Sequence, residues 1–267
     1  AALVGGALAL SGTVFQALLR NPLAEPYILG VSGGAAVGAV GVLAFFGAAA
    51  AWATPVAALV GAIAAVALVF RIATAVGGLI DTRVLLLAGV VVGAFCNALI
   101  LLLLTLTDIE TFRSAVFWMM GSLSGASWPA ALSLGACLAV AGAVLLALAR
   151  PLNLLAVGEE TALYLGTRVE RVKTIAYLAA SLLVAVGVSV SGVIGFIGLI
   201  VPHALRLVWG SDHRFLLPAS VLAGAAFLLA ADTIARTIAA PSALPVGVVT
   251  ALIGVPVFVV LLTRRSA

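Results

Sequence analysis

The sequence predicts an all-α fold: a polytopic bundle of transmembrane helices. Of its 267 residues, 65% are hydrophobic and 8% are charged, whereas a soluble domain carries about 25% charged residues. The mean hydropathy is +1.35, so the chain has too little polar surface to cover a soluble core. Its apolar runs are continuous and lack the alternation of barrel strands. Since only helices and closed barrels satisfy the backbone in lipid, the spans are predicted to be helices.

Nine apolar runs are candidate membrane spans, because about 20 apolar residues cross the hydrocarbon layer. The sixth and seventh runs are continuous, and as one helix they would be about 54 Å long, too long for a single crossing. We therefore expect a turn at Ser189–Gly192, and one transmembrane domain over 1–267. The nine expected spans are 1–19, 28–47, 52–70, 84–107, 129–149, 174–190, 193–209, 216–239 and 246–263.

Between the fourth and fifth expected spans, residues 108–128 are amphipathic and too short to cross a membrane. Trp118 and Trp128 suit the aromatic belt at a membrane surface. We expect a short surface or re-entrant helix in this interval.

The longest polar interval of the chain is Pro151–Lys173, called here the polar segment. It contains three of the nine acidic residues and three of the thirteen basic ones. Glu159 and Glu160 suit the start of a helix and Gly166 its end, and Thr167 is placed to cap a second helical turn. A solvated loop is the plain alternative, but the capped helices favour a surface that binds a soluble partner.

The basic residues are distributed unequally between the two sides of the expected bundle. Arg113 and Arg236 lie toward one side and eleven others toward the opposite side, which the positive-inside rule makes cytoplasmic. The polar segment is then cytoplasmic too, and the charges indicate topology and no nucleic-acid partner. The eleven are Arg20, Arg71, Arg83, Arg150, Arg168, Arg171, Lys173, Arg206, Arg214, Arg264 and Arg265.

No strong enzyme motif is present. A P-loop requires Gly-x-x-x-x-Gly-Lys-Ser/Thr, and the only lysine, Lys173, follows a valine. The run Gly30–Gly33 matches the Gly-x-Ser-Gly of rhomboid intramembrane proteases, in which a serine, here Ser32, pairs with a histidine, here His203. The rhomboid histidine is followed by glycines at helical spacing and His203 is not, so close helix packing is the favoured role of this run.

Other polar side chains within the apolar runs offer few sites. His203 and His213 are candidate metal or haem ligands, but no carboxylate or cysteine stands at ligand spacing beside them. We expect no metal site and no resident cofactor. Asp232 and Arg236 are four residues apart and can form an ion pair. That pair is either structural or an outward-facing docking charge, and the sequence leaves both roles open.

Seven segments, in order along essentially the whole chain, carry a resemblance to a known family. They are GGALALSGTVFQALLRNPLAEPYILGVSGGAA (5–36), VLLLAGV (84–90), FWMMGSLSG (117–125), LGTRVERVK (165–173), SGVIGFIGLIVPHALRL (191–207), DHRFLLP (212–218) and LPVGVVTALIGVPVF (244–258). These segments resemble the FecCD-type permeases, the membrane subunits of binding-protein-dependent ABC importers for iron–siderophore chelates, haem and cobalamin.

The resemblance implies an ABC importer permease fold with ten spans, of which the first is missing here. It implies a homodimer in the lipid of a bacterial or archaeal cell (inner) membrane, with two cytoplasmic ABC ATPase subunits. It also implies a periplasmic or lipid-anchored substrate-binding protein. Spans 84–107 and 246–263 are expected to line the pathway at the dimer axis.

The resemblance also assigns residues. The polar segment corresponds to the loop that couples the permease to the ATPase, and two cytoplasmic loops correspond to a gate. Arg236 corresponds to an arginine that faces glutamates of the docked binding protein. The coupling residues are Glu159, Glu160, Leu165 and Gly166, and the gate residues are Asn21, Leu23 and Thr82.

The expected function is therefore import of a bulky metal chelate by alternating access, driven by ATP hydrolysis on a partner, so the chain itself is no enzyme. An ion-gradient-driven secondary transporter is the first alternative. Such proteins carry carboxylates or broken helices at mid-membrane, whereas here Asp232 is the only acid well inside an expected span and has Arg236 as partner. The rhomboid-like protease with Ser32 and His203 is the second alternative.

Overall fold

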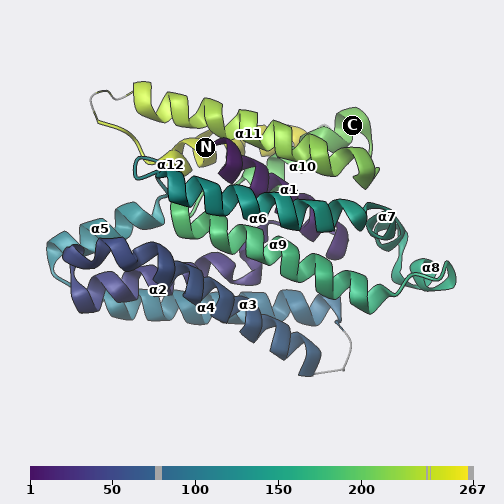
Figure 1. Ribbon diagram of the computed structural model, residues 1–267, viewed down its shortest axis with the longest axis horizontal. Coiled ribbons are helices and arrows are strands. Elements are labelled where there is room, and N and C mark those ends of the chain that lie inside the picture. Colours follow the sequence, from purple (N-terminus) through teal and green to yellow (C-terminus); the bar gives the residue numbers. More distant parts are fainter. Residues whose placement is uncertain (76–79, 239, 241, 264–267) are drawn as a thin grey trace.

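The computed structural model describes residues 1–75, 80–238, 240 and 242–263, and over these it is all-α. The long helices run roughly side by side, with α5 at one end of the bundle and α7 and α8 at the other (Figure 1). We call these the α5 end and the α8 end. The elements are α1 (Ala2–Leu18), η1 (Pro26–Leu29), α2 (Val31–Phe46), η2 (Ala48–Ala53), α3 (Thr54–Ala75), α4 (Thr82–Thr105), α5 (Ile109–Met119), α6 (Trp128–Ala147), α7 (Ala149–Val157), α8 (Glu159–Tyr164), α9 (Val169–Ser191), α10 (Ile197–Trp209), α11 (His213–Thr237) and α12 (Val246–Thr263).

Each of the nine expected spans corresponds to an apolar helix, but the helices differ in length. Five are long and apolar enough to cross a membrane: Ala49–Ala75, α4, α6, α9 and α11. The apolar helices α1, α2, α10 and α12 are shorter. With 13 residues, α10 is only about 20 Å long, against a hydrocarbon layer of about 30 Å. Helix length therefore supports five full crossings and leaves the count of nine unconfirmed. Residue 239, Arg264 and Arg265 lie outside the described residues.

Helix α1 lies at the centre of the bundle, because its residues from Val4 to Leu18 are all buried. It packs against α9, α10 and α11, and glycines allow the close approach. A Cβ added at Gly12 would lie 2.0 Å from the carbonyl oxygen of Gly198 in α10. One added at Gly5 would lie 2.2 Å from the carbonyl oxygen of Gly224 in α11. At both positions the two helix backbones are in direct contact, and neither glycine has room for a larger side chain.

The expected break between the sixth and seventh spans is present, but it lies at residues 192–196 and not at Ser189–Gly192, because α9 continues through Ser191. Gly192 caps the end of α9 with a φ of +68°, and α10 begins five residues later, at Ile197. The intervening backbone bonds to the segment around η1. The Tyr27 hydroxyl donates to the Ile194 carbonyl at 2.8 Å and accepts from its N–H at 3.0 Å. A carboxylate oxygen of Glu25 accepts from the Phe196 N–H at 2.7 Å. Protein groups thus satisfy this non-helical backbone, as is required inside a membrane.

Residues 108–128 include the expected short helix, α5. The side chain of Asp108 caps it by accepting from the Thr111 N–H at 2.8 Å, and this hydrogen bond lowers the pKa of the Asp108 carboxyl. Trp128, at the start of α6, is 81% exposed, while Trp118 is half-buried.

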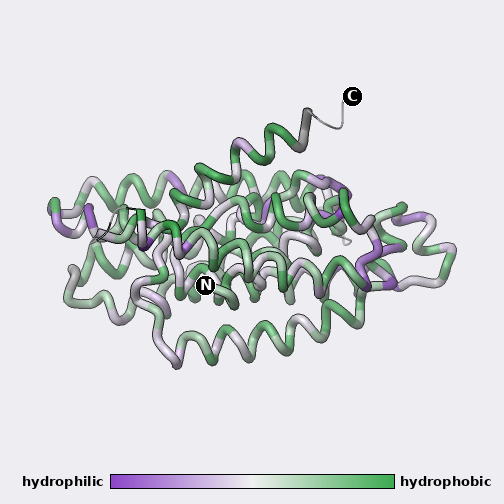
Figure 2. The backbone as a smooth tube through the Cα atoms, turned by 90° about the horizontal axis from the view of Figure 1, so that it is seen from above, coloured by the Kyte–Doolittle hydropathy of each residue, from purple (hydrophilic) through white to green (hydrophobic). Residues whose placement is uncertain are grey.

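Helix α12 extends away from the rest of the bundle (Figure 2). Its main helix contacts are with α10 and α11, and much of its surface is uncovered. Its exposed large hydrophobic side chains are Leu252, Val255, Val257, Val259 and Val260.

Candidate functional site: the α8 end of the bundle

The polar segment is more helical than expected. Pro151–Val157 belongs to α7, and α8 follows Gly158 and ends before Gly166, whose φ is +80°. The prediction that Thr167 caps a second helical turn is wrong. Its N–H donates to the Ala162 carbonyl at 2.9 Å, so Thr167 helps to close α8. That second turn is instead the first turn of α9, which has no side-chain cap.

Helix α8 projects beyond the ends of the neighbouring helices (Figure 1), and it exposes apolar side chains. Tyr164 is 91% exposed, and Val157, Leu163 and Leu165 are each more than half exposed. We call these four residues the α8 patch. Glu160 and Arg168, close to it in the chain, are exposed as well. An exposed aromatic side chain among charged groups is typical of a surface that contacts another protein.

Glu159 has a different environment from Glu160. One of its carboxylate oxygens lies 2.5 Å from the Lys173 ammonium, and the other lies 3.7 Å from the Arg20 guanidinium. Lys173 is only 4% exposed and also donates to the Ile80 carbonyl at 2.7 Å. The resemblance implied a coupling role for Glu159, which stays a prediction; in the structure its carboxylate forms an internal ion pair. Lys173 served only to assign topology from the sequence, although the chain's single lysine, beside an apolar helix, is a signal for such a pair.

The three expected gate residues lie on two neighbouring segments at the same end. The side-chain oxygen of Asn21 accepts from the Leu23 N–H at 2.9 Å, so Asn21 shapes the turn after α1. The Thr82 hydroxyl donates to the Leu18 carbonyl at 3.4 Å, and this contact joins the start of α4 to the end of α1. Leu23 is exposed. The structure thus brings both segments to the α8 end.

A second polar cluster connects α7 to α11. The amide group of Asn153 donates to a carboxylate oxygen of Asp212 at 2.8 Å, and its carbonyl oxygen accepts from the His213 N–H at 2.8 Å. Arg214 pairs with Asp212 at 2.7 Å. The Arg214 and Asn153 side chains hold the pKa of the Asp212 carboxyl well below its usual range. Sequence reasoning missed this cluster, because Asn153 and Asp212 are 59 residues apart.

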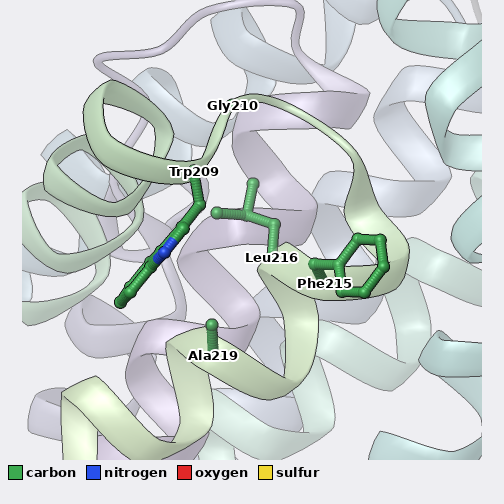
Figure 3. Close-up of a pocket in the computed structure, with 5 residues that line it drawn as sticks. All are labelled: Trp209, Gly210, Phe215, Leu216 and Ala219. Carbon is green, nitrogen blue, oxygen red and sulfur yellow. The ribbon is translucent and has the colours of Figure 1, made fainter.

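A pocket of about 410 Å³ lies beside it, at the turn between α10 and α11. Figure 3 shows the Trp209 and Phe215 rings on either side of Leu216, with Ala219 below. These side chains offer almost no polar group that could fix the orientation of a ligand. The pocket is therefore a poor candidate for a substrate site.

At the α5 end, the expected pairing of Asp232 with Arg236 is confirmed, with Nε 2.9 Å from Oδ2. The Arg236 side chain also donates to the Leu123 carbonyl at 3.4 Å and is 51% exposed. The pair therefore has a structural role and still presents a positive charge to the surroundings.

Ser32 and His203 belong to different parts of the bundle. Ser32 lies in α2, which packs mainly against α3 and α4, and His203 lies in α10, which packs against α1, α11 and α12. The His203 ring meets Phe258 of α12 in a T-shaped contact at 6.4 Å.

Among the described residues, no group of three or more His, Cys, Asp or Glu side chains could hold a metal ion.

An apolar helical bundle with five helices long enough to cross a membrane is the architecture of a multi-pass membrane protein. The chain belongs to the FecCD transport family, which it matches over residues 1–264. It is 47% identical over 265 residues to the cobalamin import system permease protein BtuC of Halobacterium salinarum, covering 99% of this chain and 70% of that protein. It is 43% identical over 269 residues to the hemin transport system permease protein HmuU of Yersinia pestis, covering 99% and 80%.

The fold agrees with this assignment. A solved structure of a proposed metal-chelate type ABC transporter, in an inward-facing conformation, superposes with a TM-score of 0.91 at 34% identity. The match covers 98% of this chain and 83% of that one. The chain is thus a permease subunit of an ABC importer and, like these relatives, a transport protein and not itself an enzyme.

Proposed function

We propose that this chain is the membrane subunit of an ATP-driven importer that moves a bulky metal chelate, such as an iron–siderophore, haem or cobalamin, into the cytoplasm. The names of the relatives support this class of substrate. The observation that carries the proposal is the α8 patch: an exposed apolar surface on a polar, projecting element. A cytoplasmic ABC ATPase binds there and moves the permease.

The distribution of charge supports the orientation. At the α8 end lie Arg20, Arg168, Arg171 and Lys173, whereas Arg236 lies at the α5 end. By the positive-inside rule the α8 end faces the cytoplasm of a bacterial or archaeal cell. The α5 end then faces outward, where a substrate-binding protein delivers the chelate.

The uncovered faces of α4 and α12 are the proposed contact with a second copy of the chain. On α4, Leu87, Val90 and Phe95 are more than half exposed. An open groove of about 570 Å³ runs along α12 from Met119 to Pro256 and is almost entirely apolar. A pathway with few polar groups suits transport, because a tightly binding pore would retain its ligand. Alternating access between the two copies would open it to either side in turn.

Reconstitution tests the proposal directly. The permease, its ATPase and its binding protein are placed in liposomes and uptake of labelled cobalamin, haem and an iron–siderophore is measured. We expect uptake of one of these only with ATP and all three components. Uptake that continues without the ATPase and follows an ion gradient would instead support a secondary transporter.

Replacing Arg236 by glutamate is expected to weaken docking of the binding protein by at least tenfold, about 1.4 kcal/mol, because a charge at the edge of an interface steers association. The dissociation constant is measured by surface plasmon resonance on the permease in nanodiscs. Asp232→Asn is the control, since it breaks the same ion pair but leaves the positive charge. Equal loss in both variants would show that the pair matters only for structure.

A further inference from the structure

Both backbone polar groups of one residue, Ile80, are bound by side chains of the first turns of α9. The Lys173 ammonium donates to the Ile80 carbonyl at 2.7 Å, and a Glu170 carboxylate oxygen accepts from the Ile80 N–H at 3.0 Å. Ile80 stands two residues before the start of α4 and is itself 5% exposed. The entrance to α4 is therefore attached to α9 by two charge-assisted hydrogen bonds, which are the stronger kind.

The same ammonium group also holds α8. Lys173 forms its ion pair with Glu159, the first residue of α8, at 2.5 Å. A lysine that is 4% exposed needs compensating partners, because an uncompensated buried charge is strongly unfavourable. Here the partners come from two other elements, so the Lys173 ammonium bridges them. Separating α8 from the entrance to α4 requires breaking one of its two bonds.

An exposed ion pair also connects the turn after α1 to α8: the Arg20 guanidinium lies 3.7 Å from the Glu159 carboxylate. Arg20 has a left-handed φ of +47°, which is uncommon for a residue with a side chain. Its side chain is 46% exposed, so solvent weakens this contact. The buried contact of Lys173 with Ile80 and the part-buried contact of Glu170 with Ile80 are the stronger connection.

We propose that Lys173 and Glu170 are positioning residues that make α8 and the entrance to α4 move as one unit. A displacement of α8 is then transmitted to the cytoplasmic end of α4, where Thr82 lies. This inference rests on the proposed function, in which the ATPase displaces α8. The inference names the side chains that transmit this displacement to the expected gate residue Thr82. It also gives Glu159 the role of linking α8 to Lys173.

The test uses spin labels on the complete importer, with Cys96 and Cys137 replaced by alanine. One label is placed on α8 at Thr161 and another at Arg83, both exposed, and each is paired with a reference label at Leu132, on the outer face of α6. Distances are measured by pulsed electron paramagnetic resonance with and without ATP. In the unmodified chain we expect ATP to change both distances.

In Lys173→Met we expect the Thr161 distance to respond to ATP and the Arg83 distance to lose its response. Uptake should fall at least tenfold while ATP hydrolysis stays within twofold of the unmodified importer. Lys173→Arg keeps the charge and should keep both responses. Arg171→Met removes an exposed charge two residues earlier on α9 and should leave uptake unchanged.

The outcomes separate the inference from the proposed function. An Arg83 response that persists in Lys173→Met with normal uptake overturns the inference alone. If α8 does not respond to ATP in the unmodified chain, the proposed role of α8 is wrong. If Lys173→Met does not fold, Glu170→Ala is compared with Glu170→Gln, which keeps an oxygen to accept from Ile80. Equal coupling in those two variants also overturns the inference.

Discussion

Replacing Tyr164 by aspartate is expected to abolish stable association of the permease with the ABC ATPase proposed as its partner. Tyr164 is 91% exposed and the most exposed member of the α8 patch, and tyrosines at interface hot spots often contribute about 2 kcal/mol or more to binding. Loss of the ring weakens the complex roughly thirtyfold at that value, and a buried carboxylate without a partner weakens it further. Co-purification and the ATPase rate of the complex in nanodiscs provide the measurement.

Two variants make this result specific. Tyr164→Phe keeps the aromatic ring and should retain the ATPase. Phe215→Ala removes another aromatic side chain that is 69% exposed but lies beside the pocket at the α10–α11 turn, so it should also retain it. Normal association of Tyr164→Asp would show that the α8 patch is not the docking surface.

Replacing Gly12 by alanine is expected to prevent most of the protein molecules from folding. A single Cβ at this position would lie 2.0 Å from the Gly198 carbonyl oxygen and 2.5 Å from the Gly198 Cα. Backbone atoms cannot rotate away as a side chain can, so α1 and α10 would have to separate. Because α1 is the buried centre of the bundle, we expect a loss of more than about 3 kcal/mol. Size-exclusion chromatography of detergent extracts measures the folded yield.

Gly187→Ala is the matched control. Gly187 also lies inside a helix and is buried, but a Cβ there would meet no atom within 4 Å. Alanine favours helix over glycine by about 1 kcal/mol, so this variant should be as stable as the unmodified chain or slightly more stable. Similar yields for Gly12→Ala and Gly187→Ala would contradict the close packing of α1 on α10.

Features that depend on neighbours in the chain could be predicted from the sequence. Continuous apolar runs predicted helices, and the break at Gly192, the end of α8 before Gly166 and the pairing of Asp232 with Arg236 followed from local spacing. The first turn of α9 was misassigned because Thr167 suits a helix start locally. In the structure the Thr167 N–H donates to the Ala162 carbonyl in α8. A sequence pattern alone does not show to which of two adjacent helices a residue forms its hydrogen bond.

By itself, the sequence determined that this protein is an all-α, multi-pass membrane protein with one long polar segment, since composition and periodicity depend on the solvent around each helix, and its motifs carried the resemblance to a permease family. Only the tertiary structure decided which backbones touch and which charges pair. Glu159 and Lys173 are 14 residues apart, and Lys173 and Ile80 are 93 apart. Folding brings these three residues together. A buried ammonium group needs an opposite charge and hydrogen-bond acceptors, and here residues far apart in the chain supply them.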